Sequence, residues 1–295
     1  MRNKTGLLRR LCCAVLGLLL AGLICVLPAH AAGENTTYTY TLSADDEWIR
    51  TQDAYLPGKI YLKGAGLSQP QDLFLRGGEI YIADTGNHRI AVYDPRTDTM
   101  CAFGEDELDS PVGLFVSEDG TVYAAGYERQ GDRIVAKVWE NGTLKYTPGA
   151  PGADSYAYSV FAANGSLYTA GSEESGGALT AKIWKDGDAL YAYSVSPAVS
   201  QARSVCVSGG DVYAAGSLQS GLTKPLAVVW KNDKAHYTLS DGETPAGVNA
   251  LCLSGRTLYA AGHSGGAAAV WKDKELLYTL TDGSSYAEAT AVCRF

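Results

Sequence analysis

The sequence is poor in cysteine, histidine and methionine, with seven, four and two residues respectively in a chain of 295. Three of the cysteines lie in the first 31 residues, and the four that follow are too few for a disulfide scaffold in a domain of this size. The chain also lacks His-x-x-x-His and Cys-x-x-Cys pairs, a phosphate-binding glycine loop and a Gly-x-Ser-x-Gly elbow, so no common metal, nucleotide or hydrolase motif indicates an activity. It shows no helical periodicity either, which argues against an α-helical fold.

The first residues are typical of a secretory signal. Basic residues precede an apolar run at residues 11–27, and Ala29-His30-Ala31 has the small-x-small pattern of a cleavage site. The alternative is a transmembrane anchor, but the run is shorter than the roughly 20 residues that a span requires, and Pro28 ends it. We predict a signal peptide at residues 1–31, cleaved after Ala31. A secreted or extracytoplasmic domain without a membrane span would then occupy residues 32–295.

The chain is acidic, with 24 Lys and Arg against 32 Asp and Glu. The predicted signal contains four basic and no acidic residues, so its removal leaves 20 basic and 32 acidic residues and a formal charge of −12. Such a domain repels nucleic acid and anionic membranes, and we expect neither as a partner. A simpler interpretation of the charge, which we favour, is a solvated acidic surface.

A hairpin with a marker tyrosine recurs along the chain. Its first copy, GGEIYIADTGNHRIAVYDP at residues 77–95, contains two runs of β-branched and aromatic residues around the turn segment Asp-Thr-Gly-Asn. The marker tyrosines are Tyr81, Tyr123, Tyr168, Tyr213 and Tyr259. Each unit also has a Phe or Cys before this tyrosine, an aromatic residue after it, and a further Tyr or Met beyond that.

These markers define four strands per unit, a to d. The steps from a to b and from c to d are nearly always 7 residues and the step from d to the next a is always 15, whereas b to c varies between 12 and 17. Four short strands in a unit of about 40–45 residues predict a blade of a β-propeller. We expect the aromatic residues to pack between blades, and the Ala and Gly of strand b to mark a close approach of adjacent blades.

The repeat predicts an all-β, six-bladed propeller with four-stranded antiparallel blades. Five complete blades occupy residues of about 70–110, 111–155, 156–200, 201–246 and 247–286. Residues 287–295 resemble a strand a without its partners, and residues 38–63 contain strand-like pieces without a strand a. We expect these two segments to share one blade and to close the ring, which would leave no open edge.

The first blade, residues 70–104, resembles an NHL repeat through QDLF, EIYIADTGNHRIAVYD and FG. The later blades resemble a divergent bacterial propeller repeat with a VYAAG…VWKNG pattern. The resemblance implies a platform that binds protein, peptide or RNA, although the acidic charge argues against RNA. It also implies that Asp84, Asn87 and Arg89 stabilise the blade. A minority of related propellers are enzymes of lyase or lactonase type, which bind a metal ion with residues from several blades.

We predict a monomeric, non-catalytic binding module that recognises a peptide, glycan or protein and needs no cofactor. The alternative is a metal-dependent propeller enzyme of lyase or lactonase type. Because b–c segments vary while the framework does not, we place the binding surface on the face formed by the b–c and d–a loops. The candidate contacts are His88, Tyr127, Arg129, Arg133, Glu173, Arg203, Lys224, His263 and Tyr286.

Three cysteines occupy the strand a position at which the first three blades have Phe74, Phe115 and Phe161. They are Cys206, Cys252 and Cys293. We expect them to be buried, unpaired thiols that act as small core residues.

Overall fold

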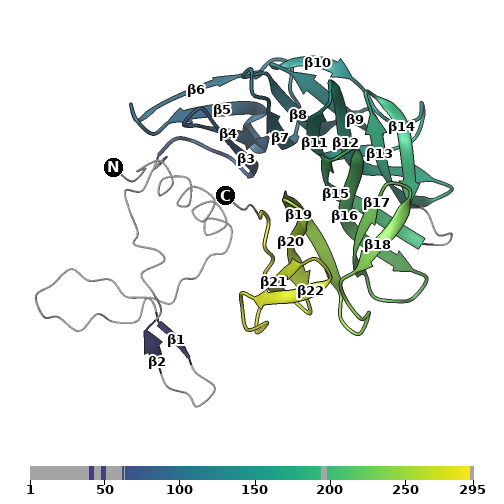
Figure 1. Ribbon diagram of the computed structural model, residues 1–295. Coiled ribbons are helices and arrows are strands. Elements are labelled where there is room, and N and C mark those ends of the chain that lie inside the picture. The colour runs from purple at the N-terminus through teal and green to yellow at the C-terminus, as the bar shows by residue number, and fades with distance from the viewer. Residues whose placement is uncertain (1–39, 43–47, 51–61, 63, 194–197, 293–295) are drawn as a thin grey trace, which may run out of the picture. The chain divides into compact units, whose positions relative to one another are not determined.

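The computed structural model describes residues 40–42, 48–50, 62, 64–193 and 198–292 (Figure 1). The chain divides into two units, Met1–Gly64 and Ala65–Phe295. In the first unit, β1 (Tyr40–Leu42) pairs antiparallel with β2 (Trp48–Arg50). Among the described residues, no helix is long and apolar enough to cross a membrane.

The second unit contains five four-stranded antiparallel sheets in chain order, and it is a β-propeller. The first sheet is β3 (Pro70–Arg76), β4 (Glu79–Asp84), β5 (Arg89–Asp94) and β6 (Thr99–Phe103), with the 3-10 turn η1 (Thr85–Asn87) between β4 and β5. The second is β7 (Pro111–Val116), β8 (Val122–Gln130), β9 (Arg133–Glu140) and β10 (Thr143–Tyr146). The third is β11 (Ser155–Ala163), β12 (Ser166–Ser175), β13 (Ala178–Lys185) and β14 (Asp188–Tyr193). The fourth is β15 (Ala198–Ser208), β16 (Asp211–Ser220), β17 (Leu226–Lys231) and β18 (Lys234–Thr238). The fifth is β19 (Ala246–Ser254), β20 (Thr257–Ser264), β21 (Ala267–Lys272) and β22 (Glu275–Thr279).

The register confirms the tyrosine marker as the basis of the repeat. In every sheet, the marker of strand a lies directly opposite the marker tyrosine of strand b, as in Phe74 and Tyr81 or Cys206 and Tyr213. The variable b–c segments of the second and third sheets are extended hairpins rather than irregular loops, because the strands lengthen and a two-residue turn joins them. Strands a and b thus pair in the same register around the marker in every sheet, while the b–c hairpins differ in length.

The c–d turns contain an Asn or Asp in the left-handed region, such as Asn141 with φ 50° and Asp186 with φ 53°. The side chain of this residue accepts a hydrogen bond from strand b: Asn141 Oδ1 lies 2.9 Å from the Val122 amide, and Asp186 Oδ1 lies 2.8 Å from the Leu167 amide. The backbone amide of the same residue donates to the carbonyl of that strand b residue. In the four later sheets the c–d turn is thus fixed to its own strand b, whereas Asp98 in the c–d turn of the first sheet accepts a hydrogen bond from the Tyr93 hydroxyl of strand c.

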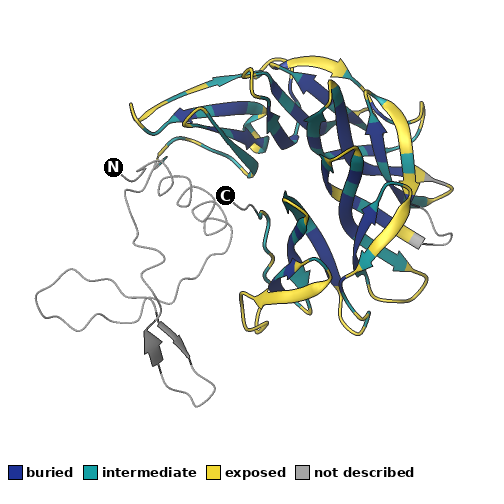
Figure 2. Cartoon of the chain, in the orientation of Figure 1, coloured by how far each residue is buried: buried dark blue, intermediate teal, exposed yellow. Residues whose placement is uncertain are grey.

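The core lies between consecutive sheets, as expected for the aromatic residues. Trp139, Trp230 and Trp271 are at most 3% exposed, and each packs in a cluster shared with the preceding sheet. Tyr193 of the third sheet stacks on Trp230 of the fourth at 4.7 Å between ring centroids. Figure 2 shows the buried middle strands in dark blue and the exposed fourth strands in yellow. Burial of large aromatic surfaces is the main stabilising term in such interfaces.

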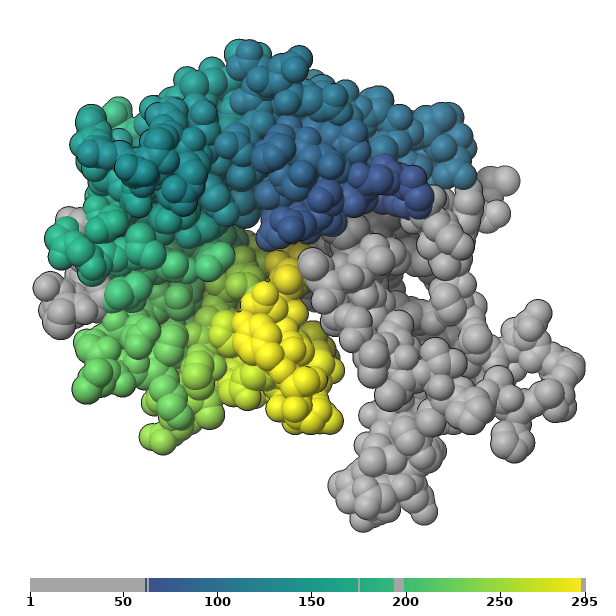
Figure 3. All heavy atoms as spheres, turned by 180° about the vertical axis from the view of Figure 1, so that it is seen from behind, coloured from purple at the N-terminus to yellow at the C-terminus, as the bar shows by residue number. Residues whose placement is uncertain are grey.

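Consecutive innermost strands contact one another, from β3 to β7, β11, β15 and β19. The rings of Phe74, Phe115 and Phe161 follow one another with centroid distances of 5.3 and 4.9 Å. In Figure 3, which views the molecule from behind, the surfaces of the sheets follow in chain order from blue through green to yellow.

The prediction of six blades differs from the structure, in which the described residues form five four-stranded sheets. Residues 287–292 form no strand, and residues 293–295 and most of residues 38–63 lie outside the described part of the chain. A strand requires a partner ladder, and β1 and β2 pair with each other. The Ala287 amide does donate to the Gly266 carbonyl, as the equivalent Ala246 amide, 41 residues earlier, donates to Pro225.

The thiols follow the prediction in part. Cys206 is buried and free, as predicted. Cys252 is free but only half-buried, as are Phe115 and Phe161 at the same strand a position. Cys293 lies outside the described residues.

Candidate functional site

A β-bulge interrupts each innermost strand near its beginning. One residue of the strand has no partner in the register, whereas the residues on both sides of it do. The bulge residues are Gln71, Val112, Tyr158, Arg203 and Asn249. Bulges bend a strand and redirect a side chain, and they are frequent beside functional sites. All five lie near the end of their sheet where the b–c hairpins and the d–a connections meet, which we call the loop face.

The repeated glycine of strand b makes the bulge possible in the later sheets. A Cβ on Gly171 would lie 1.8 Å from the Tyr156 carbonyl oxygen, and one on Gly216 would lie 1.8 Å from the Gln201 carbonyl oxygen. Both carbonyls belong to strand a of the same sheet. The expectation that this glycine marks a contact between adjacent blades is therefore wrong at these positions, because the close approach occurs within one sheet.

Three tyrosines and an arginine contact one another at the loop face. The rings of Tyr127 and Tyr156 meet edge to face at 5.3 Å, and Tyr156 stacks parallel to Tyr158 at 6.0 Å. The Arg203 guanidinium lies 4.5 Å from the centre of the Tyr158 ring, and its Nη2 donates to Gln201 Oε1 at 2.8 Å. A cation over a tyrosine ring is attracted by the ring quadrupole. The guanidinium is thereby positioned while it remains exposed to solvent.

A second group of polar side chains lies beyond Arg203. The rings of His263 and Tyr286 are 5.6 Å apart, and Glu288 accepts hydrogen bonds from Tyr286 at 3.0 Å and from Asn249 at 3.1 Å. Burial lowers the pKa of His263, and the positive charge of Arg203 lowers it further against the opposing effect of Glu288. The imidazole is therefore neutral at pH 7. Burial and Glu288 raise the pKa of Tyr286, and the charge of Arg203 opposes this effect. Arg203 therefore acts on both His263 and Tyr286.

We call these residues together the tyrosine–arginine cluster. Its members are Tyr127, Arg129, Tyr156, Tyr158, Gln201, Arg203, Asn249, His263, Tyr286 and Glu288. Five of them were predicted from the sequence. We include Arg129 because it stands two residues after Tyr127 on β8 and its charge acts on Tyr156. The pKa of Tyr156 is raised, by burial first and then by Asp154 and Glu174, and Arg129 opposes this effect.

The other predicted contacts lie elsewhere. His88 pairs with Asp109 at 3.0 Å, and Lys224 donates to the Glu243 carbonyl at 2.5 Å. Glu173 is buried, and it accepts a hydrogen bond from the Ala150 amide at 2.6 Å and pairs with Lys182 at 2.8 Å. This placement makes Glu173 a support of the connection between the second and third sheets.

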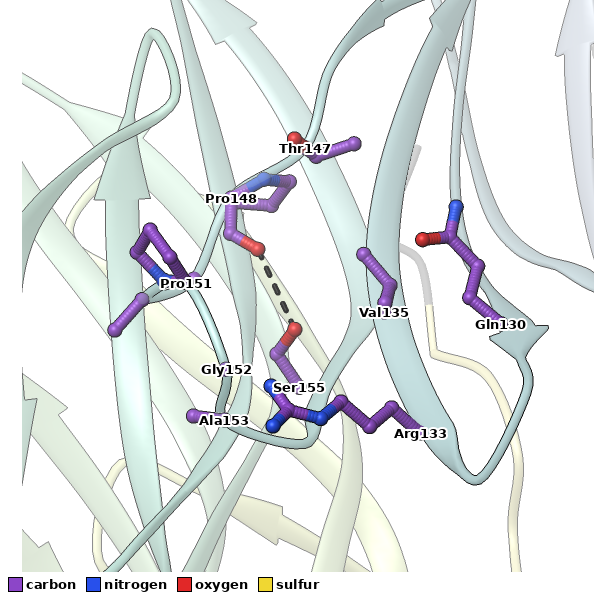
Figure 4. Close-up of a pocket in the computed structure, with 11 residues that line it drawn as sticks. Gln130, Arg133, Val135, Thr147, Pro148, Pro151, Gly152, Ala153 and Ser155 are labelled. Atoms are coloured by element: carbon purple, nitrogen blue, oxygen red, sulfur yellow. Dashed lines mark hydrogen bonds between the residues drawn. The ribbon is translucent and has the colours of Figure 1, made fainter.

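Arg133 lines a pocket of about 390 Å³ between the b–c hairpin of the second sheet and the connection at residues 147–153 (Figure 4). Figure 4 shows the Arg133 side chain extending toward Gly152 and Ala153, and a hydrogen bond of 3.5 Å from Ser155 Oγ to the Pro148 carbonyl at the back of the pocket. The lining is largely backbone and small side chains, with one cation. The pocket can therefore accept a small anionic or hydroxylated group at the edge of the loop face.

The residues that we missed occupy strand a rather than the hairpins. Tyr156 and Tyr158 precede the strand a marker by five and three residues, as do Gln201 and Arg203 in the next sheet. The signal was present in the glycine of YTAG and YAAG, since a strand glycine often marks a bulge. Strict alternation gives no indication of which residue is bulged, and that is why these side chains escaped attention.

The described arginines differ in whether a carboxylate pairs with them. Arg89 and Arg96 each pair with a carboxylate, at 2.8 and 2.9 Å. Among the residues that the structure describes, Arg129, Arg133 and Arg203 have no carboxylate oxygen within 4.0 Å, and all three are exposed. In the same part of the chain, no group of three His, Cys, Asp or Glu side chains is placed to hold a metal ion.

The first sheet confirms the structural role that its motif implies. Asp84 is fully buried, and its Oδ2 accepts hydrogen bonds from Asn87 and Arg89, both at 2.8 Å. Residues 67–93 match the NHL repeat family. A comparison with curated proteins found no match. The chain is therefore a β-propeller of which the first four-stranded sheet contains an NHL repeat, and four further four-stranded sheets follow it in the described residues.

Proposed function

We propose that this chain is an exported, non-catalytic binding module whose partner docks on the loop face of the propeller. The observation that supports the proposal is the tyrosine–arginine cluster. Its side chains from the second to the fourth sheet contact one another in turn, and the charge of Arg203 acts on His263 of the fifth sheet. Tyrosine and arginine are the residues most often found at the energetic centres of interfaces.

The backbone beneath the cluster is held in place, which favours binding of a partner. Tyr158, Arg203 and Asn249 all stand on bulges of innermost strands, so their backbones are fixed by the ladders on both sides. Preorganised side chains lose little conformational entropy when a ligand binds. The differing hairpins around them supply the variable part of the surface.

The six-bladed ring also belongs to this proposal. We infer that residues 38–63 and 287–295 complete a sixth blade, which makes the export-processed domain a closed monomer. Leu276, Tyr278 and Leu280 of the fifth sheet are 53%, 59% and 57% exposed, which is unusual for apolar side chains in one area and indicates a surface to be covered. The Ala287 amide already occupies the place that Ala246 has in the preceding repeat.

Hydroxyl-radical footprinting tests the ring closure. In the chain from residue 32 onward, Leu276, Tyr278 and Leu280 should be protected, and a chain that begins at residue 65 should expose them to oxidation. Equal oxidation of these side chains in the two chains would contradict a sixth blade built from the N-terminal segment.

Binding is tested with glycan and peptide arrays and the mature domain. The loop-face variant combines Tyr158→Ala with Arg203→Ala, and the control combines Glu118→Ala with Arg256→Ala, which are exposed residues in a–b turns at the opposite end of the sheets. The c–d turn residues Asn141 and Asp186 are unsuitable controls, because their side chains hold strand b.

We expect the loop-face variant to lose the array signals while its circular dichroism and unfolding midpoint stay close to those of the control. Loss of binding in the control alone, with both variants folded, would place the partner on the opposite face.

A further inference from the structure

The loop face of this acidic chain carries exposed arginines. The chain carries a formal charge of −8, yet three exposed arginines without a carboxylate partner among the described residues occur on this face. Arg129 and Arg203 belong to the tyrosine–arginine cluster, and Arg133 lines the neighbouring pocket. Unpaired arginines are matched to carboxylates, which accept two parallel hydrogen bonds from one guanidinium. The ligand should therefore carry carboxylate groups.

The rest of the cluster is suited to sugar rings. A pyranose has an apolar C–H face, which packs on flat aromatic rings such as those of Tyr156 and Tyr286, and a rim of hydroxyls that both donate and accept. Gln201 and Asn249 present amides, which offer both a donor and an acceptor. His263 is neutral, and its Nδ1 has no hydrogen-bond partner among the described residues.

The cluster therefore combines side chains that suit sugar hydroxyls with side chains that suit carboxylates. A peptide strand would instead need a row of free backbone groups. Strands a and d are the two edges of each sheet, and each strand a that carries the cluster is interrupted by a bulge, which disrupts such a row.

We propose that the tyrosine–arginine cluster binds an acidic oligosaccharide, in which the carboxylates of uronic acid units pair with Arg203 and Arg129 while the sugar rings pack on the tyrosines. This inference rests on the proposed function, because it names the ligand class of the same face. Arg133 and its pocket extend the site toward the outside of the second and third sheets.

Titration calorimetry with three probes tests the ligand class. The probes are an oligogalacturonate, a neutral cello-oligosaccharide of the same length and an oligoglutamate peptide of the same charge. We expect the oligogalacturonate to bind mature wild-type protein, and its affinity to fall with rising salt because the pairing is ionic. The neutral oligosaccharide should bind at least about tenfold more weakly, and the peptide, which has no rings to pack, should bind more weakly as well.

Two single variants separate the charge from the rings. Arg203→Gln keeps a planar amide but removes the charge, and it should weaken oligogalacturonate binding about tenfold or more while it abolishes the preference over the neutral sugar. Tyr156→Ala should weaken both sugars. Arg256→Gln, a matched arginine at the opposite end of the sheets, should leave binding unchanged.

The outcomes distinguish this inference from the proposed function. Equal affinity for the neutral and acidic sugars, lost in Tyr156→Ala, would overturn the carboxylate requirement and leave binding at the loop face intact. Tighter binding of the peptide than of either sugar would overturn the sugar class. If neither sugar binds wild-type protein, the inference fails, whereas the proposed function is still judged by the loop-face variant on the arrays.

Discussion

At one position of strand b, the first sheet has a charged side chain and the four later sheets have no side chain. Three residues after the marker tyrosine, the first sheet has Asp84 and the later sheets have Gly126, Gly171, Gly216 and Gly262. Asp84 is fully buried, and it accepts hydrogen bonds from Ser68, Asn87 and Arg89. In the later sheets a carbonyl oxygen of strand a occupies the space of a side chain.

A second position repeats the contrast. Asp72 of the first innermost strand accepts a hydrogen bond at 2.8 Å from the Leu114 amide of the next sheet. At the equivalent place, Ser204 accepts one from Leu251 at 3.0 Å through its hydroxyl. Carboxylates thus connect the first sheet where small or neutral residues connect the later ones. The first sheet should consequently be sensitive to removal of these carboxyl groups, and the later sheets to gain of volume.

The largest expected effect is that of Asp84→Ala. The change leaves Arg89, only 18% exposed, with the more exposed Glu105 as its remaining carboxylate partner, and it removes the acceptor of the Ser68 amide. Breaking a buried ion pair from one side costs about 3–5 kcal/mol of unfolding free energy. Denaturant unfolding measures it.

Asp94→Ala in the same sheet is the control. Asp94 pairs with the 64% exposed Arg96, so this substitution should lower the unfolding free energy much less than Asp84→Ala. Equal losses in the two variants would mean that burial of Asp84 does not distinguish the first sheet.

The next effect is that of Gly216→Ala in the fourth sheet. The new methyl group would meet the Gln201 carbonyl at 1.8 Å, so the bulge must shift, at a cost of about 1–3 kcal/mol or more. Because the bulge carries Arg203, sugar binding should weaken together with stability. Gln219→Ala, at a partly exposed site of the same strand, should stay within about 0.5 kcal/mol. A Gly216→Ala protein as stable as that control would show that the close contact does not constrain the sheet.

Much of the fold follows from the sequence because one spacing recurs. The steps between markers are nearly uniform, and a uniform step predicts the same register in each sheet, which the pairing of Phe161 with Tyr168 confirms. Closure of the ring could not be derived in the same way, since residues 38–63 lack the marker spacing. The candidate site was only partly predictable. Tyr127 and His263 stand out as polar or aromatic residues in variable segments, whereas Tyr158 looks like an ordinary strand residue until the bulge is known.

The hydrogen bond from Leu114 to Asp72 should depend on pH, whereas the one from Leu251 to Ser204 should not. Burial raises the pKa of Asp72 from 3.8 to about 6, against the lowering effect of the Leu114 and Leu73 amides. Because the folded state favours the protonated form, this group contributes stability below about pH 4, and the contribution is lost as pH rises through about 6. The loss is on the order of 2 kcal/mol, since one pKa unit corresponds to ~1.4 kcal/mol and the side chain is partly exposed.

Asp72→Ser converts the connection to the type that Ser204 makes, and it should remove this loss. The difference in unfolding free energy between wild type and variant should therefore change between pH 4 and pH 7. A difference that stays constant over this range would contradict a raised pKa for Asp72.

The smallest expected effect concerns the thiols, which also differ between the first sheet and the later ones. Cys101 is exposed on β6, whereas Cys206 is buried in β15, where burial and the neighbouring Cys252 raise the pKa of its thiol to about 12. The thiolate is the reactive form. In the folded protein, iodoacetamide should therefore label Cys101 first and Cys252, which is half-buried, more slowly, while Cys206 stays unlabelled until the sheets unfold. Peptide mapping by mass spectrometry resolves the three sites.

Cys101→Ser should change the unfolding free energy by no more than about 0.5 kcal/mol. Labelling of Cys206 as fast as Cys101 under native conditions would show that the fourth and fifth sheets separate readily, which would contradict the burial of this thiol between them.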